Sequence, residues 1–268
     1  MVDGTYDESM SVLPLCVRLA LWATAAYAGQ LTVDAAVQRA HPDLDHVTGD
    51  LGRLSLWRDL GERAVLVALP RPENLSGMPR GSADLIAAAT EAGECVYVPG
   101  IGGALVPTIE HFGPADDQGT RVTWSAYDCD PVAVHTLEAL SLSEIERAFR
   151  QDLMEHTRAI EALDARPWAN SAFRSIADEL TVSQWGLPAG LPTRATRIIT
   201  MAATVGVATR LGLSDQAQSQ VLTGMVAGQR AIVLTALDAR ADTAIAAATT
   251  VAALALAGLR PGRDHPQP

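Results

Sequence analysis

The spacing of apolar positions predicts three helices in the first sixty residues. The run from Pro14 to Ala28 is apolar except for one arginine, and Gly29 stands where such a helix would end. Thr32 can cap a short second helix over residues 33–40. Leucines at helical spacing predict a third over residues 51–60.

Strand patterns dominate the middle of the chain. Continuous apolar or alternating segments predict three or four strands, with one helix after the first of them. Pro107 lies inside the third segment, which favours an edge strand or a bulge there. The turns between the segments are short, so the sheet should be small and mostly antiparallel. The predicted strands cover residues 64–69, 95–98, 104–112 and 121–127, and the helix covers residues 82–92.

From Ser141 onward the pattern is helical. Apolar positions follow a 3.6-residue stripe to Ile160, and further helices are expected over residues 170–182, 193–213, 214–239 and 240–259, the last three as two or three long helices. Only nine residues of the span 193–260 are charged. Helices so poor in charge need cover, either in a bundle core within one chain or in the seam of a homodimer.

These elements predict an α+β fold with N-terminal helices, a small sheet and a C-terminal helical bundle. We expect an α+β region over residues 1–135, a helical region over residues 136–260 and a disordered tail over residues 261–268.

Composition narrows the chemistry. The 268 residues include 20 basic ones, all arginine, and the absence of lysine excludes a Walker-type phosphate loop and a pyridoxal phosphate Schiff base. The net charge is −11, and residues 81–146 hold eleven acids against the single Arg121. This acidity argues against nucleic-acid binding and favours a basic protein partner. We expect no cofactor.

Cysteine usage and hydropathy point to the cytoplasm. The three cysteines show no CxxC spacing, which indicates neither a disulfide framework nor a zinc site. The uncharged stretch over residues 243–259 is rich in alanine and threonine, and alanine contributes little to membrane insertion. We therefore expect a protein without a membrane span.

One loop holds the densest cluster of metal-capable side chains, namely His41, Asp43, Asp45 and His46. Imidazoles and carboxylates are ligands for transition metals, yet the spacing matches no established pattern. A polar loop between two elements is the simpler interpretation.

A second candidate is a ligand pocket between the sheet and the C-terminal helices. The aromatic residues Trp124, Tyr97 and Phe112 could line it, with Arg121 holding an anionic group. Aromatic residues at alternating strand positions also suit an ordinary core.

Two other motifs give weaker indications of a functional site. Cys129 stands between Asp128 and Asp130, whose charges should raise the pKa of its thiol. The glycines of residues 100–103 lack the third glycine and the following helix of a dinucleotide site, so they predict a turn.

Several short motifs resemble an uncharacterised family of actinobacterial proteins over roughly residues 60 to 210. They are Ala68-Leu69-Pro70-Arg71-Pro72 with Gly77, then Gly93-Glu94, Leu105-Val106-Pro107 and Ser141-Leu142-Ser143-Glu144. The resemblance implies no activity and no site residue. The proline and glycine positions are typical of strand ends and turns.

Two functions remain open from the sequence. The first is a non-catalytic interaction or regulatory protein that assembles through its charge-poor C-terminal helices. The second is a small-molecule-binding protein or enzyme with a pocket between the sheet and those helices.

Overall fold

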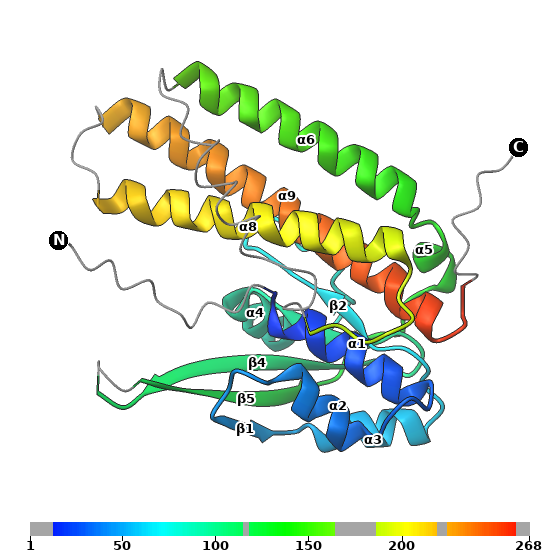
Figure 1. The fold of residues 1–268 in the computed structure, drawn as a ribbon. Helices are drawn as coiled ribbons and strands as arrows, with labels where there is room; N and C mark the ends of the chain where they lie inside the picture. Colours follow the sequence, from blue (N-terminus) through cyan, green and yellow to red (C-terminus); the bar gives the residue numbers. More distant parts are fainter. Residues whose placement is uncertain (1–12, 115–117, 164–185, 219–223, 261–268) are drawn as a thin grey trace, which may run out of the picture.

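The computed structural model describes residues 13–114, 118–163, 186–218 and 224–260, and it shows an α+β fold (Figure 1). Helix α1 (Leu15–Tyr27) begins directly after Pro14 and is buried over almost its whole length. The Thr32 hydroxyl accepts the backbone N–H of Ala35 and caps α2 (Val33–Ala40). The predicted helices in this part are confirmed, including α3 (Gly52–Asp59).

The sheet has five strands, slightly more than predicted. Their order is β1-β5-β4-β3-β2, and all neighbours are antiparallel except β1, which runs parallel to β5. The predicted strands appear in the structure, and β1 is an addition that no periodicity signalled. The strands are β1 (His46–Gly49), β2 (Leu66–Ala68), β3 (Cys95–Val98), β4 (Gly103–Phe112) and β5 (Gly119–Tyr127).

The prediction that Pro107 marks an edge strand or a bulge is wrong, because β4 lies inside the sheet and its pairing with β5 is continuous. Pro107 pairs with Trp124, whose carbonyl accepts the N–H of Asp50 and so points away from β4. The nitrogen of Pro107 therefore faces the β3 side. There β3 pairs only with Gly103–Leu105, so no ladder hydrogen bond is lost.

Helices cover both faces of the sheet. His41 at the end of α2 packs its ring edge-on against Trp124, and Trp57 of α3 lies against Gly103 on the same face. Helix α4 (Ala83–Ala92), which Ser82 caps, contacts β4. The outer edge of β2 is closed by α1, where the Thr24 hydroxyl bonds both the N–H and the carbonyl of Val65.

The C-terminal helices form a layer beside this α+β part (Figure 1). They are α5 (Val134–Glu138), α6 (Leu142–Leu163), α8 (Thr193–Gln218) and α9 (Gly224–Leu256). Helix α9 contacts α6, α8, α1 and β2, and it continues without a break through Arg240. Of the two or three long helices predicted over residues 193–259, the described residues thus form two. The helix expected at residues 170–182 and the tail at residues 261–268 lie outside the described residues.

Helix α9 is a long apolar helix whose side chains must be buried against other elements. Its stretch Val226–Leu256 is long and apolar enough to cross a membrane, but 61% of its apolar 18-residue window is buried inside the chain, as in the core helix of a globular protein. Its second half, from Ala241 onward, packs into the same core as α1 and the sheet. One chain alone therefore provides the cover that this half of α9 requires.

Candidate functional site

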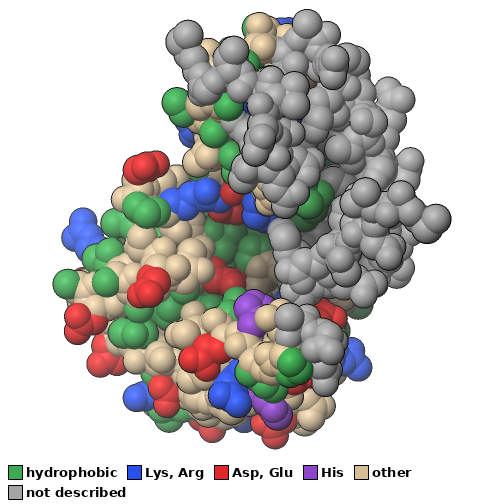
Figure 2. Space-filling model, turned by 90° about the vertical axis from the view of Figure 1, so that its left-hand side faces the viewer, with side chains coloured by type: hydrophobic (Ala, Val, Ile, Leu, Met, Phe, Trp, Pro, Cys, Tyr) green, Lys and Arg blue, Asp and Glu red, His purple; other side chains and the backbone are tan. Residues whose placement is uncertain are grey.

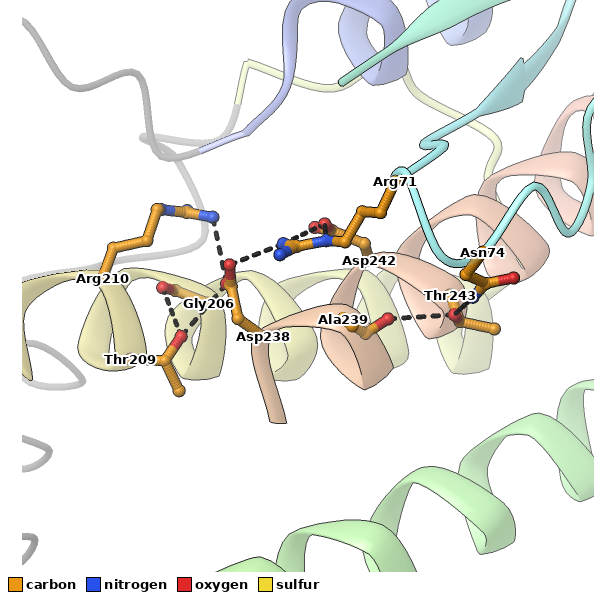
Figure 3. A network of polar contacts seen from close by, with 9 residues as sticks. All are labelled: Arg71, Asn74, Gly206, Thr209, Arg210, Asp238, Ala239, Asp242 and Thr243. Carbon is orange, nitrogen blue, oxygen red and sulfur yellow. Dashed lines mark hydrogen bonds and ion pairs between the residues drawn. The ribbon is translucent and has the colours of Figure 1, made fainter. Parts of the chain in front are cut away.

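A network of buried charges joins the sheet to the C-terminal helices (Figure 3). Arg71 follows β2 directly after Leu69-Pro70, and its guanidinium bonds both Asp238 and Asp242 of α9. The two aspartates are four residues apart, so they lie on one face of the helix. Both are largely buried, whereas Arg71 is 28% exposed. The loop after β2 is thus tied to α9 by one arginine and two carboxylates.

Helix α8 completes the network. Arg210 places Nη1 3.3 Å from Oδ1 of Asp238. The Thr209 hydroxyl lies 3.1 Å from the same oxygen and 2.8 Å from the Gly206 carbonyl (Figure 3). Asp238 therefore lies between two arginines from different parts of the chain.

The surroundings of Asp242 are less balanced. Burial raises the pKa of Asp242, the positive charge of Arg71 opposes that rise, and the negative charge of Asp238 adds to it. Figure 2 shows a hollow between the C-terminal helices and the α+β part, and basic and acidic side chains gather at its walls.

Glu94 extends this polar region toward α1. It precedes β3, is buried, and accepts the backbone N–H of Cys16 at 2.8 Å. Burial raises the pKa of Glu94 to about 7; the Cys16 hydrogen bonds and the charge of Arg18 lower it, and Asp242 raises it. Glu94 therefore stands electrostatically between Arg18 on α1 and Asp242 on α9. We call Arg18, Arg71, Glu94, Asp238 and Asp242 the junction site.

The four metal candidates take part in separate contacts. The buried His41 uses Nδ1 on the Val37 carbonyl at 2.7 Å, and Asp43 accepts from Arg18 Nη1 at 2.8 Å. Asp45 accepts the N–H of Thr120, and the ring of His46 stacks on Phe112. No group of three metal-capable His, Cys, Asp or Glu side chains forms within the described ranges.

The four residues that were predicted to line a ligand pocket do not all come together in the structure. Arg121 and Phe112 meet near the tip of the β4–β5 hairpin, with the guanidinium carbon 5.2 Å from the ring centre. Strand register places Trp124 and Tyr97 on opposite faces of the sheet. Trp124 contacts the ring of His41.

The remaining motifs behave as predicted. Burial is the first cause that raises the pKa of Cys129 to about 11, and Asp130 and Asp128 add to it. The glycine-rich segment is a turn between β3 and β4, and Glu62 accepts the N–H of Ile101 there.

Sequence reasoning missed the central residues of the network. Asp238 and Asp242 are the only acids of α9, at helical spacing in an otherwise charge-poor helix, and that pattern is a usable signal. Their partner Arg71 is separated from them by more than 160 residues. No local pattern identifies such a partner.

Comparison with protein families gives matches over most of the chain. Residues 16–139 match the N-terminal domain of the Rv1486c-like proteins, and residues 143–246 match their C-terminal domain. The family is named after a protein of Mycobacterium tuberculosis, which agrees with the actinobacterial resemblance of the sequence motifs. Comparisons with curated proteins and with solved structures found no match.

Proposed function

The chain belongs to the Rv1486c-like protein family, whose domain names state no activity, and from its geometry we propose that it is a non-catalytic small-molecule-binding protein. The junction site between the sheet, α1 and the C-terminal helices is the proposed binding region. The observation that supports this proposal is that five buried or half-buried charged groups lie where elements from both matched domains meet.

Binding needs convergent polar groups next to apolar walls. The junction site supplies guanidinium groups from Arg18 and Arg71 and carboxyl groups from three acids, all within a core of leucine, valine and alanine side chains. A small polar molecule that entered there would touch the sheet part and the helical part together. Ligand binding would then stabilise their association.

The state of the thiols supports the non-catalytic part of the proposal. Burial raises the pKa of Cys16 and Cys95, and it raises the pKa of Cys129 to about 11. A protonated thiol is a poor nucleophile at neutral pH. We also propose a cytoplasmic protein, since the apolar window of α9 is mostly covered by the rest of the chain.

A screen of the thermal midpoint of the full chain tests the proposal. Carboxylic acids, phosphates, amines and neutral sugars are added separately, and at least one class is expected to raise Tm with a saturable dose dependence. Asp242→Asn should reduce that shift, whereas Glu146→Gln, which changes a carboxylate paired with arginines of α6 and α8, should leave it unchanged. No shift with any class would refute the proposal.

Assembly through the C-terminal helices is a second candidate. Ile232 of α9 is 70% exposed and Met154 of α6 is 54% exposed, so both helices carry uncovered apolar side chains. A homodimer seam would cover them. Light scattering after gel filtration should then give twice the mass of 28.2 kDa, and Ile232→Glu should return it to the monomer value. A monomer for the native sequence would refute this candidate.

A further inference from the structure

Three buried side chains near the loop after α2 each have polar atoms without a hydrogen-bond partner among the described residues. They are Arg18 of α1, His41 at the end of α2 and Trp124 of β5, which are 5%, 4% and 1% exposed. The unpartnered atoms are Nε and Nη2 of Arg18, Nε2 of His41 and Nε1 of Trp124. Native proteins rarely leave such atoms unsatisfied, and a cluster of them calls for an explanation.

The free atoms of Arg18 are a matched pair. Its Nη1 donates to Asp43, while Nε and Nη2 lie together on the other edge of the guanidinium plane. That edge presents two parallel N–H groups, which fit two oxygens of one carboxylate or phosphate. The edge of this arginine that best fits an oxyanion is therefore the one without a hydrogen-bond partner in the part of the chain that the structure describes.

His41 and Trp124 add an acceptor and a donor. The Nδ1 atom of His41 faces the Val37 carbonyl, so it carries the proton, and burial lowers the pKa of the ring and keeps it neutral. Its Nε2 atom then accepts, whereas the indole N–H of Trp124 donates. The two ring centres are 5.7 Å apart, and the charge of Arg18 acts on His41.

We propose that Arg18, His41 and Trp124 bind the oxyanion end of a small hydroxylated ligand. Its carboxylate or phosphate oxygens would bond Nε and Nη2 of Arg18, the indole of Trp124 would donate a further hydrogen bond, and a hydroxyl group would donate to Nε2 of His41. This inference rests on the proposed function, and it names the ligand chemistry at the α1 side of the junction site.

A ligand would reach the cluster when part of the loop above it moves. The unpartnered polar atoms are buried, and Asp43, whose side chain is 64% exposed, forms an ion pair with Arg18. Only the Asp43 half of this ion pair is exposed, so the buried guanidinium needs another partner when Asp43 moves away. An anion bound at Nε and Nη2 would supply that partner. Movement of residues 42–44 would open the cluster, while Asp45 stays bonded to Thr120 of β5. It would also move the negative charge of Asp43 away from an anion bound at Nε and Nη2 of Arg18.

Titration of the full-length protein with glycolate, acetate and inorganic phosphate tests this inference at constant ionic strength. Calorimetry measures affinity, and the indole N–H signal of Trp124, identified with Trp124→Phe, reports the position. We expect saturable binding with a shift of this signal, tighter for glycolate than for acetate because only glycolate offers a hydroxyl to His41. Tighter binding of phosphate than of glycolate would assign the ligand to the phosphates.

Variants give the sharpest comparison. Asp43→Asn should bind at least about twofold more tightly, because it removes a negative charge beside the buried guanidinium of Arg18. Arg18→Gln and Arg18→Lys should lose most of the affinity, since neither keeps the two parallel donors. Arg39→Gln is the matched control: it removes an equal charge two residues from His41, from a guanidinium that lies over Trp22, and should change nothing. If Arg18→Gln does not fold, Arg18→Lys and Trp124→Phe, which loses one donor, carry the test.

Three results would overturn the inference. They are unchanged affinity in Arg18→Lys, binding without a shift of the Trp124 signal, and no binding of any of the three anions to the native protein or to Asp43→Asn. The proposed function survives each of them if a neutral or cationic compound from the wider screen still raises Tm. It fails only if that screen is also empty.

Discussion

The carboxyl group of Glu94 accepts the backbone N–H of Cys16 at 2.8 Å, which fixes the start of β3 against the first turn of α1. This contact is buried, and the charges of Arg18 and Asp242 act on Glu94. The protein thus keeps an ionisable group at the point where its first helix, its sheet and its last helix come together. A change in pH should therefore alter the charge at this point of the fold.

The first prediction concerns stability against pH. Because burial raises the pKa of Glu94 from its usual 4.5 to about 7, the folded state holds a proton that the unfolded state releases between these values. The free energy of unfolding should therefore fall as pH rises from about 4.5 to 7, by about 3 kcal/mol from this group. Glu94→Gln, which mimics the protonated form, should remove that fall. Urea unfolding at several pH values measures it.

Two other groups titrate nearby and must be separated from Glu94. The raised pKa of Asp242 acts in the same direction, whereas the lowered pKa of His41 makes the protein lose stability as pH falls below 6.5. Both contributions are present in the native protein and in Glu94→Gln, so the difference between the two pH profiles isolates Glu94. Parallel profiles would show that Glu94 ionises normally in the folded protein.

The second prediction concerns the ion network. Arg71→Met removes the cation that serves Asp238 and Asp242 and leaves two largely buried carboxylates with Arg210 alone. Loss of one partner of a buried pair costs about 3–5 kcal/mol, and the partial exposure of Arg71 favours the low end of that range. Urea unfolding should show this loss.

A compensating variant makes the test specific. Asp242→Asn combined with Arg71→Met removes one of the stranded charges, so it should recover part of the lost stability. If the combined variant is no more stable than Arg71→Met, the arginine acts through packing and not through the aspartates. The coupling between the two changes, measured by a double-mutant cycle, gives the answer directly.

Local patterns predicted most elements because each is fixed by its own residues. Thr32 and Ser82 cap helices through their own hydroxyl groups, and apolar runs define β2 and β3. Strand β1 was not predicted, because its four residues are mostly exposed and show no apolar pattern. Its partner strand, β5, lies 75 positions away in the sequence. Pro107 misled because a proline is harmless in an interior strand where the neighbour strand has already ended.

The candidate site was less predictable for the same reason. Asp43 and His41 stand two residues apart in sequence, yet one pairs with α1 and the other packs on β5. The contacts of Arg71 depend on how the loop after β2 meets α9, which is a property of tertiary packing. Residue types in a loop indicate available chemistry, whereas their directions come from elements far away in the chain.

The third prediction concerns the protected edge of the sheet. The Thr24 hydroxyl accepts the N–H of Val65 at 2.9 Å and bonds its carbonyl, both in the buried core. Thr24→Val keeps the shape of the side chain and leaves that N–H unsatisfied, at a cost of about 1–3 kcal/mol. Thr200→Val, which changes a hydroxyl that bonds the Arg197 carbonyl within α8, is the matched control and should cost little. Equal losses in both variants would mean that Thr24 does not close this edge.

The fourth prediction concerns Gly49, the last residue of β1. Its φ of +98° belongs to the left-handed region, and a Cβ there would clash with the backbone carbonyl of Trp124. Gly49→Ala should therefore detach β1 from β5 and cost more than the about 1–2 kcal/mol of the backbone conformation alone. Gly29→Ala separates the two effects, because Gly29 has a φ of +81° but open space where its Cβ would stand. Hydrogen exchange at the amides of Asp45 and Asp50, which bond to β5, should accelerate in Gly49→Ala and stay slow in Gly29→Ala. Slow exchange in both variants would contradict the tight approach of β1 to Trp124, and with it the position of the loop that covers Arg18.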